Sequence, residues 1–315
     1  MKFSEFIPPF SDFGFKNLYG KPKPESKENL RFLLNAIIKD WPGLEHDPIV
    51  DLQYRNPDHQ GDNPERKSTK FDVYCVTESG KHFIVEMQNQ PDRHLKQRLI
   101  FYLCQAVTEL DRRTNSQEPW NYDFPPVLVI MMCNFIDPEI DHAEVNYFGL
   151  VNLKTHRPLG GYIGLSFIQI PLFPEKREDC KTEIERIVFS MDNMEAIINN
   201  KVESFSTREG DFYDRIKTMS QTAALSEKEL HAYHQWLKVE NDERLRLKEA
   251  RDEGMARGEK KGRAEGIAVG MAEGERQQAW RSAERMFAKQ MPLEEISEFT
   301  GLTVEELKKR FNPSR

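Results

Sequence analysis

Polar residues interrupt an otherwise apolar pattern between Phe71 and Asn89, in the segment FDVYCVTESGKHFIVEMQN. Two runs rich in β-branched and aromatic residues flank the tripeptide Glu78-Ser79-Gly80. Such runs are typical of β-strands. A three-residue loop that ends in glycine suits a type I turn followed by a left-handed residue. The pattern therefore predicts a tight antiparallel hairpin.

Three polar residues, Asp72, Glu86 and Gln88, lie within these two strands. Because positions 72 and 86 are equidistant from Ser79, a turn centred on Ser79 places the two acids opposite each other. Directly opposed residues have Cβ atoms about 4.5–5.5 Å apart, and carboxylates that close repel each other unless a cation lies between them. Strand alternation puts Gln88 on the same face as Glu86. This arrangement suits a divalent-metal site for phosphodiester chemistry.

A hairpin with two acids can also turn one solvated face outward, and most such pairs do. Here Phe83, Ile84 and Val85 are consecutive apolar residues. Such a run indicates a strand covered on both faces, where an isolated carboxylate is energetically costly. The pattern alone leaves both interpretations open.

The rest of the first 200 residues predicts helices and strands around this hairpin. An irregular lead-in is expected over residues 1–24. Helices are expected from Ser26 to about Trp41, from about Arg93 to Arg112 and over 181–198. Further strands are expected at 49–56, 127–135, 147–153 and 167–173, with 127–135 at the centre of the sheet. The order predicts an α/β fold, with a mixed central sheet flanked by helices.

The pattern changes in the second half of the chain, where we expect an all-α C-terminal extension. Ser226 and Glu229 form the sequence pattern of a capping box, which predicts the start of a helix of mixed charge. Between Gly254 and Gly274 a glycine then recurs at every fourth residue. Each interior glycine costs a helix about 1 kcal/mol relative to alanine. This cost favours a flexible tether, with helical self-association as the second interpretation.

The last segment again predicts ordered helices. One short helix is expected to end at Thr300-Gly301, and the next begins at Thr303 with Glu306 as its capping partner. Such a pair resembles a helix-turn-helix. Its basic residues, however, come at the end of the second helix, whereas base-reading residues project from the start. A helical hairpin for packing or protein contact is therefore equally consistent. The chain is therefore expected to consist of a first domain at 1–200, a helical connector at 201–253, the glycine-spaced segment at 254–275 and a small helical module at 276–315.

Composition adds limits on compartment and partners. The 315 residues carry a net charge of −7, which argues against binding of nucleic acid by bulk charge but allows a local basic groove. The four cysteines lie far apart without a CxxC pair, so buried reduced thiols are expected. No signal peptide and no apolar run of about 18 residues is apparent. We expect a soluble, cytoplasmic protein without a membrane partner.

Three segments together resemble a known family. SDFGFKNLYG at 11–20, the hairpin segment with its VEMQN end, and QRLIFY at 97–102 are similar to those of PD-(D/E)XK nuclease family transposases, also called Rpn-type recombination-promoting nucleases. The resemblance covers about residues 5–200, and the glycine-spaced tail is also typical of the group. It implies a restriction-endonuclease-like core that cleaves DNA with a divalent metal.

The resemblance implies roles for the hairpin residues. Asp72 takes the place of the first motif acid and Glu86 that of the second, while Gln88 stands where the wider superfamily has lysine. Asp72 and Glu86, with the Met87 carbonyl, would hold Mg²⁺, for which Mn²⁺ can substitute. Glutamine can orient a water molecule but supplies no positive charge.

Further residues are candidates for supporting roles. Lys16 and Arg98 are candidate contacts to DNA phosphates, and Tyr102, one turn beyond Arg98, would support the same face. Asp12 belongs to the SDFGFK motif. The alternatives are structural: Arg98 would bridge carboxylates of the fold, and Asp12 would cap or turn the lead-in.

Two functions from different classes follow. The first is a Mg²⁺-dependent DNA endonuclease, with a role in recombination or beside a mobile element, whose C-terminal helices form a homodimer or target the enzyme. The second is a degenerate nuclease scaffold that binds DNA or protein. Other hydrolase chemistry has little support, because the chain has no GxSxG, HExxH, P-loop or GxGxxG motif.

Overall fold

The computed structural model describes residues 5–41, 44, 46–56, 58–59, 69–113, 125–160, 163–206 and 208–311. The chain divides into two compact units, Met1–His234 and Gln235–Arg315. The first unit contains a six-stranded sheet in the order β1-β4-β5-β6-β8-β7 and a separate pair, β2-β3. The strands are β1 (Leu52–Tyr54), β2 (Asp58–His59), β3 (Thr69–Lys70), β4 (Val73–Thr77), β5 (His82–Gln88), β6 (Val127–Cys133), β7 (Val145–Gly149) and β8 (Ile163–Gln169).

The large sheet is mixed. Strands β1, β4 and β5 are antiparallel neighbours, β5, β6 and β8 are parallel, and β7 closes the edge antiparallel to β8. Strand β6 lies inside the sheet and all of its residues are buried. These observations confirm the predicted α/β fold with 127–133 as a central strand, and they are consistent with a restriction-endonuclease-like fold.

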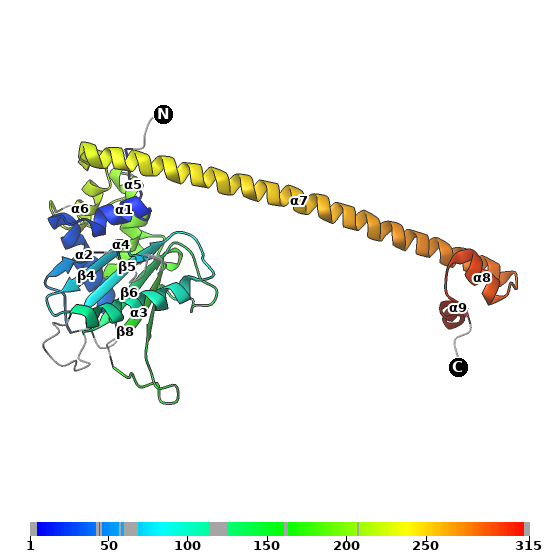
Figure 1. Cartoon of the computed structure of the whole chain (residues 1–315). Helices are drawn as coiled ribbons and strands as arrows, with labels where there is room; N and C mark the ends of the chain where they lie inside the picture. The colour runs from blue at the N-terminus through cyan, green and yellow to red at the C-terminus, as the bar shows by residue number, and fades with distance from the viewer. Residues whose placement is uncertain are drawn as a thin grey trace. The chain divides into compact units, whose positions relative to one another are not determined.

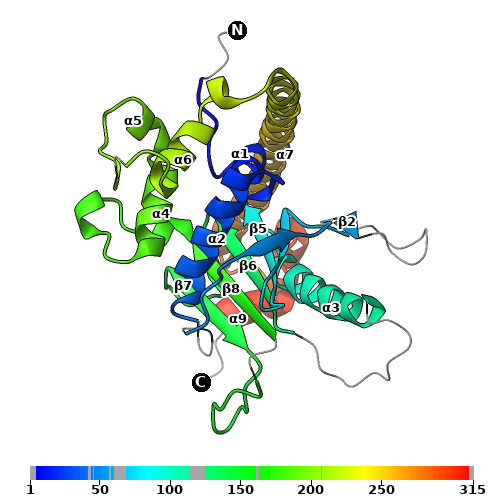
Figure 2. The ribbon, with the colours of Figure 1, turned by 90° about the vertical axis from the view of Figure 1, so that its left-hand side faces the viewer.

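Helices cover both faces of the sheet. On one face pack α2 (Pro24–Ile38), α4 (Glu183–Asp192) and α6 (Phe212–Met219), and on the other packs α3 (Leu95–Arg113) (Figure 1, Figure 2). The side chains of β6 alternate between two hydrophobic cores, one on each face of the sheet. Leu128, Ile130 and Met132 belong to the core beneath α2, α4 and α6. Val127, Val129, Met131 and Cys133 join the second. The consecutive apolar residues predicted this two-sided burial.

The N-terminal lead-in is a correction to the sequence prediction. It contains α1 (Asp12–Phe15) followed by a turn of π-helix, η1 (Lys16–Gly20), instead of irregular chain alone. Helix α2 then begins at Pro24, because proline is preset for the first helical position and needs no N–H partner there. Ser26 does not cap the helix; its buried hydroxyl donates to the Asn17 carbonyl at 3.0 Å.

Other boundaries also differ from the prediction. The strand expected at 49–56 is limited to β1, and β7 and β8 begin before the expected 147–153 and 167–173. Pro171 explains the end of β8, since it lacks the N–H of a ladder bond and lies in the 3₁₀ turn η2 (Ile170–Leu172). The helix expected over 181–198 is α4 and α5 (Met194–Ile198), divided at Asn193. Two further 3₁₀ turns are η3 (Arg177–Asp179) and η4 (Thr222–Ala224).

The glycine-spaced segment is helical. It lies within α7 (Glu227–Ala288), so the preference for a tether was wrong. The predicted capping box is confirmed, because Glu229 Oε2 accepts from the Ser226 backbone N–H at 3.0 Å and from its hydroxyl at 2.8 Å. Exposed ion pairs with four-residue spacing, such as Arg257–Glu253 at 3.2 Å, support the helix and offset part of the glycine cost.

The C-terminal end is a small helical cluster, as predicted. After α7 come α8 (Leu293–Thr300) and α9 (Val304–Phe311), and Gly301 ends α8 in the left-handed conformation with φ of 70°. The Thr303 hydroxyl and backbone N–H both bind Glu306 at 2.9 Å. A core of Ala283, Ile296, Leu302 and Leu307 joins these helices to the end of α7.

The structure also bears on the cysteines and on membrane-spanning helices. All four cysteines are free thiols, but only Cys75, Cys133 and Cys180 are buried; Cys104, on α3, is exposed. Within the described ranges, no helix is both long enough and apolar enough to span a membrane.

Candidate active site

The hairpin of β4 and β5 has the predicted register. Val73 pairs with Val85 and Cys75 with Phe83, which centres the turn on Ser79. Gly80 takes the left-handed conformation with φ of 85°, and its N–H donates to the Thr77 carbonyl at 3.0 Å. The next pair along the same register is Asp72 with Glu86.

The two acids are joined through backbone hydrogen bonds. The Asp72 N–H donates to Glu86 Oε1 at 3.0 Å, and the Met87 N–H donates to Asp72 Oδ2 at 2.9 Å. Each carboxylate thus accepts from the other side of the hairpin, just before β4 begins and near the end of β5. Glu86 is 7% exposed and the Asp72 side chain 16%. The structure therefore brings the two predicted acids together in a largely buried site.

Burial and mutual repulsion perturb this pair. Burial, followed by the charge of Asp72, raises the pKa of Glu86 to about 8, while Arg98 and Lys16 act in the opposite direction. Around neutral pH and without a metal, the pair holds a proton that an ordinary glutamate would lose. A divalent cation bound between the acids would favour their ionised forms.

Lys16 extends into the same site from the first turn of η1. Its Nζ lies 3.0 Å from Asp72 Oδ1 and 2.5 Å from Asp12 Oδ1. Burial alone would lower the pKa of Lys16, but the neighbouring carboxylates raise it above the usual value, so the amine stays charged. Asp12 does not cap α1. That position belongs to Ser11, whose hydroxyl oxygen accepts from the Gly14 N–H at 3.0 Å.

Gln88 points to α3 and is already engaged there. Its Oε1 accepts from Arg98 Nη2 at 2.8 Å, and its Nε2 donates to the Gln90 carbonyl at 2.9 Å. Arg98 Nη1 pairs with Asp92 at 3.0 Å, while its buried Nε has no hydrogen-bond partner in the described part of the chain. Arg98 thus bridges one carboxylate and the Gln88 amide, instead of two carboxylates as the structural alternative expected.

Tyr102 lies one helical turn beyond Arg98, on the side of α3 that faces the acids. Its ring makes an edge contact with Phe71 at a centroid distance of 5.1 Å. Burial, and then the charge of Glu86, raise the pKa of Tyr102. The phenol is therefore a neutral neighbour of the acid pair.

The donor set fits a hard divalent cation. Magnesium prefers oxygen ligands and is commonly held by one or two carboxylates, with waters and substrate phosphates filling the remaining positions. Asp72 and Glu86 supply two carboxylates, and the Met87 carbonyl is adjacent to both. Among the residues that the structure describes, no group of three or more His, Cys, Asp or Glu side chains could hold a metal. A site that keeps waters and takes substrate oxygens suits these residues.

The comparison with family models decides the family. The model of the PD-(D/E)XK nuclease family transposases matches residues 9–250, which include the sheet, its covering helices and both acids. The chain belongs to this family. Neither a curated protein nor a solved structure matched the chain. Membership of the PD-(D/E)XK nuclease family supports a nuclease-like function and implies DNA as the substrate.

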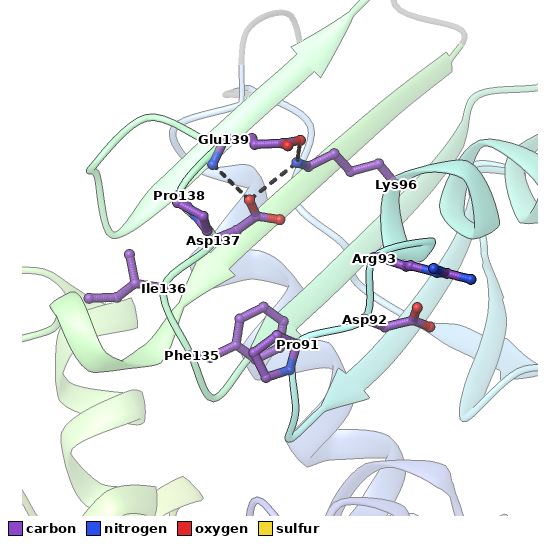
Figure 3. A pocket seen from close by; sticks show the side chains of 9 residues that line it. All are labelled: Pro91, Asp92, Arg93, Lys96, Phe135, Ile136, Asp137, Pro138 and Glu139. Atoms are coloured by element: carbon purple, nitrogen blue, oxygen red, sulfur yellow. Dashed lines mark hydrogen bonds and ion pairs between the residues drawn. The ribbon is translucent and has the colours of Figure 1, made fainter. Parts of the chain in front are cut away.

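A cavity of about 340 Å³ opens beside the strand ends of this family member. Pro91 and Asp92 line it after β5, and the chain from Phe135 to Glu139 lines it after β6 (Figure 3). Lys96 binds Asp137 at 3.2 Å and Glu139 at 2.6 Å across one wall (Figure 3). Asp92 connects the cavity to Arg98 and, through it, to Gln88.

Sequence reasoning missed two features of the candidate site. Asp92 was not singled out, although it precedes α3 and holds Arg98. The contact of Lys16 with Asp72 was also missed, because these residues lie on different elements. The SDFGFK motif was the available signal for Lys16, but the motif carries no information about which residue its lysine meets.

Proposed function

We propose that this protein is a Mg²⁺-dependent DNA endonuclease whose acid pair, Asp72 and Glu86, binds the metal. The observation that carries the proposal is the buried pair itself, linked across the hairpin by two backbone hydrogen bonds. Holding two acids this close costs stability, and Lys16 offsets the charge of Asp72 only in part, so the arrangement is best explained by a further cation that both acids bind. Manganese would substitute, because it accepts the same oxygen ligands.

The residues of the chain have distinct roles in this proposal. A bound Mg²⁺ would lower the pKa of a coordinated water and neutralise charge on the phosphate. Asp72 and Glu86 would hold the metal, with the Met87 carbonyl as a further ligand. Glu86 would lose its proton on metal binding. Gln88 holds the Arg98 guanidinium, whose partly exposed side chain would contact the DNA backbone, and Tyr102 would support the same face of α3.

Cleavage of supercoiled plasmid tests this function. Wild type, Asp72→Asn and Glu86→Gln are compared in Mg²⁺, Mn²⁺ and EDTA, and Glu203→Gln, which alters a largely exposed acid, is the control. We expect metal-dependent nicking or linearisation by wild type and the control and at least 100-fold slower cleavage by both site variants. Equal cleavage by all four proteins would exclude the acid pair as the site.

The degenerate-scaffold interpretation is favoured by one observation, the absence of a lysine at position 88. It predicts salt-sensitive DNA binding without cleavage or metal uptake. The family name also suggests a role in recombination or beside a mobile element, which we propose as the setting of the nuclease.

We further propose that α7 forms a homodimer. Basic side chains dominate one stretch of its exposed surface, namely Arg257, Lys260, Lys261 and Arg263. Acidic ones dominate the next stretch, namely Glu265, Glu273 and Glu275. Antiparallel association of two copies would place each basic stretch beside an acidic one, whereas parallel association would oppose like charges. Exposed Ile267, Val269 and Met271 supply apolar surface there.

A further inference from the structure

The nuclease motif of this chain has no cation of its own. Position 88, where the wider superfamily has lysine, is Gln88, and both ends of its side-chain amide are bound to Arg98 and Gln90. A neutral amide that is already held in this way adds no positive charge beside the acids. If the site cleaves DNA, a cation from another element must supply that charge.

We propose that Lys16 is this cation and acts as a catalytic residue; the inference rests on the nuclease function proposed above. Its amine lies 3.0 Å from Asp72 Oδ1, on the outer side of the acid pair. The Lys16 side chain is 34% exposed, against 16% for Asp72, so it is open to a substrate that approaches the acids. Asp12, on the same helical segment, holds the amine from its other side.

The fold fixes Lys16 in this place by close packing. A Cβ added to Gly20, at the end of η1, would lie 3.3 Å from Val73 Cγ2 and 3.4 Å from the Asp72 carbonyl oxygen, so this segment packs directly on the strand that bears Asp72. A Cβ on Gly14 would lie 2.0 Å from the Pro8 carbonyl oxygen, so α1 requires glycine there. The π-helical turn begins at Lys16 itself, and such turns occur frequently at functional sites.

The segment that carries Lys16 is also held by contacts outside the sheet. The Asn17 side chain donates to the Met219 carbonyl at 2.8 Å, and Lys21 pairs with Glu229 at 2.8 Å in the first turn of α7. The position of Lys16 is therefore set by contacts on both sides, independently of the motif strand β5. A flexible surface lysine would have none of these constraints.

The chemical role follows from hydrolysis of a phosphodiester. The oxygen of a water molecule forms a bond to phosphorus, the bond between phosphorus and one ester oxygen breaks, and a proton from the water ends on the leaving oxygen. Lys16 stays protonated throughout. Two of its three N–H groups bind Asp12 and Asp72, and the third donates to a non-bridging phosphate oxygen, where negative charge increases in the transition state.

The alternative is that Lys16 is only a structural partner of Asp72. Lys16→Met removes the charge and keeps a similar length, Lys16→Arg keeps the charge, and the double variant Lys16→Met/Gln88→Lys returns a lysine to the motif strand. Lys27→Met is the matched control, because Lys27 has the same 34% exposure and an ion pair of 2.6 Å with Asp51. Each variant is assayed for single-turnover plasmid cleavage at saturating protein, for Mn²⁺ binding by calorimetry and for thermal unfolding.

We expect the single-turnover rate of Lys16→Met at saturating protein to be about 100-fold lower or worse, with Mn²⁺ binding retained. Lys16→Arg should keep more activity than Lys16→Met, and the double variant should recover at least tenfold. The double variant still lacks the ion pair between position 16 and Asp72. If Lys16 were only a structural partner of Asp72, the double variant would therefore not regain cleavage.

The inference is overturned if Lys16→Met cleaves like Lys27→Met, or if its defect follows loss of Mn²⁺ binding or of folding and the double variant shows no recovery. An inactive wild type would contradict the proposed function as well. An active wild type with an unaffected Lys16→Met contradicts the role of Lys16 alone.

Discussion

At the scale of residues, the acid pair shows what the sequence could and could not predict. The pairing of Asp72 with Glu86 followed from turn symmetry, because a tight turn determines the register of both strands. The partners of Gln88 and Lys16 did not follow, since they depend on how α3 and η1 pack against the hairpin. Local rules therefore determined the acids, and tertiary packing determined the cations around them.

The raised pKa of Glu86 predicts a pH-dependent stability without metal. An unperturbed glutamate ionises near pH 4.5, whereas Glu86 in the fold ionises at about 8. Between these pH values the folded state binds more protons than the unfolded state, so the free energy of unfolding falls as pH rises. The stability that protonated Glu86 contributes is lost above pH 8. The glutamine in Glu86→Gln cannot ionise, so the stability of this variant should not fall in the same way as pH rises.

Thermal unfolding in EDTA at pH 6 and pH 8.5 measures the difference. Between pH 6 and pH 8.5, we expect the Tm of wild type to fall by several degrees more than the Tm of Glu86→Gln. A change of 1 kcal/mol in stability corresponds to about 2–4 °C in a domain of 150–250 residues. Parallel changes in both proteins would show that Glu86 has an ordinary pKa.

At the scale of elements, periodicity predicted the helices and strands better than their ends. The consecutive apolar residues of β6 predicted a central strand, and the Thr303 and Glu306 pattern predicted the start of α9. The α7 prediction failed because intrinsic glycine cost was weighed without the ion pairs along the helix. The α1 and η1 prediction failed because neighbouring prolines concealed a short helix that Ser11 caps.

The charge pattern of α7 predicts how two copies associate. Reversing its basic block with Lys260→Glu/Lys261→Glu, or its acidic block with Glu273→Lys/Glu275→Lys, should weaken the homodimer, because like charges then oppose each other. Mixing the two variants should restore a dimer, because each altered block meets one of opposite sign. Light scattering at low and high salt measures the assembly, and a monomer in wild type at every salt concentration would exclude it.

At the scale of the whole molecule, we propose a local site for an anionic substrate on an acidic chain. The net charge of −7 opposes bulk attraction of DNA, so under this proposal binding would depend on cations placed beside the acids, namely Lys16, Arg98 and a divalent metal. Family membership supports a nuclease-like function, and the buried pair is where we propose that this function lies.

Calorimetric titration of Mn²⁺ into the metal-free protein tests the central claim most directly. Wild type, Asp72→Asn, Glu86→Gln and the Glu203→Gln control are titrated at pH 8, where the pair ionises readily. The account predicts a binding signal in wild type and the control and a loss of at least tenfold in affinity in both site variants. Equal binding by all four proteins, or binding by none, would contradict a metal centre at Asp72 and Glu86.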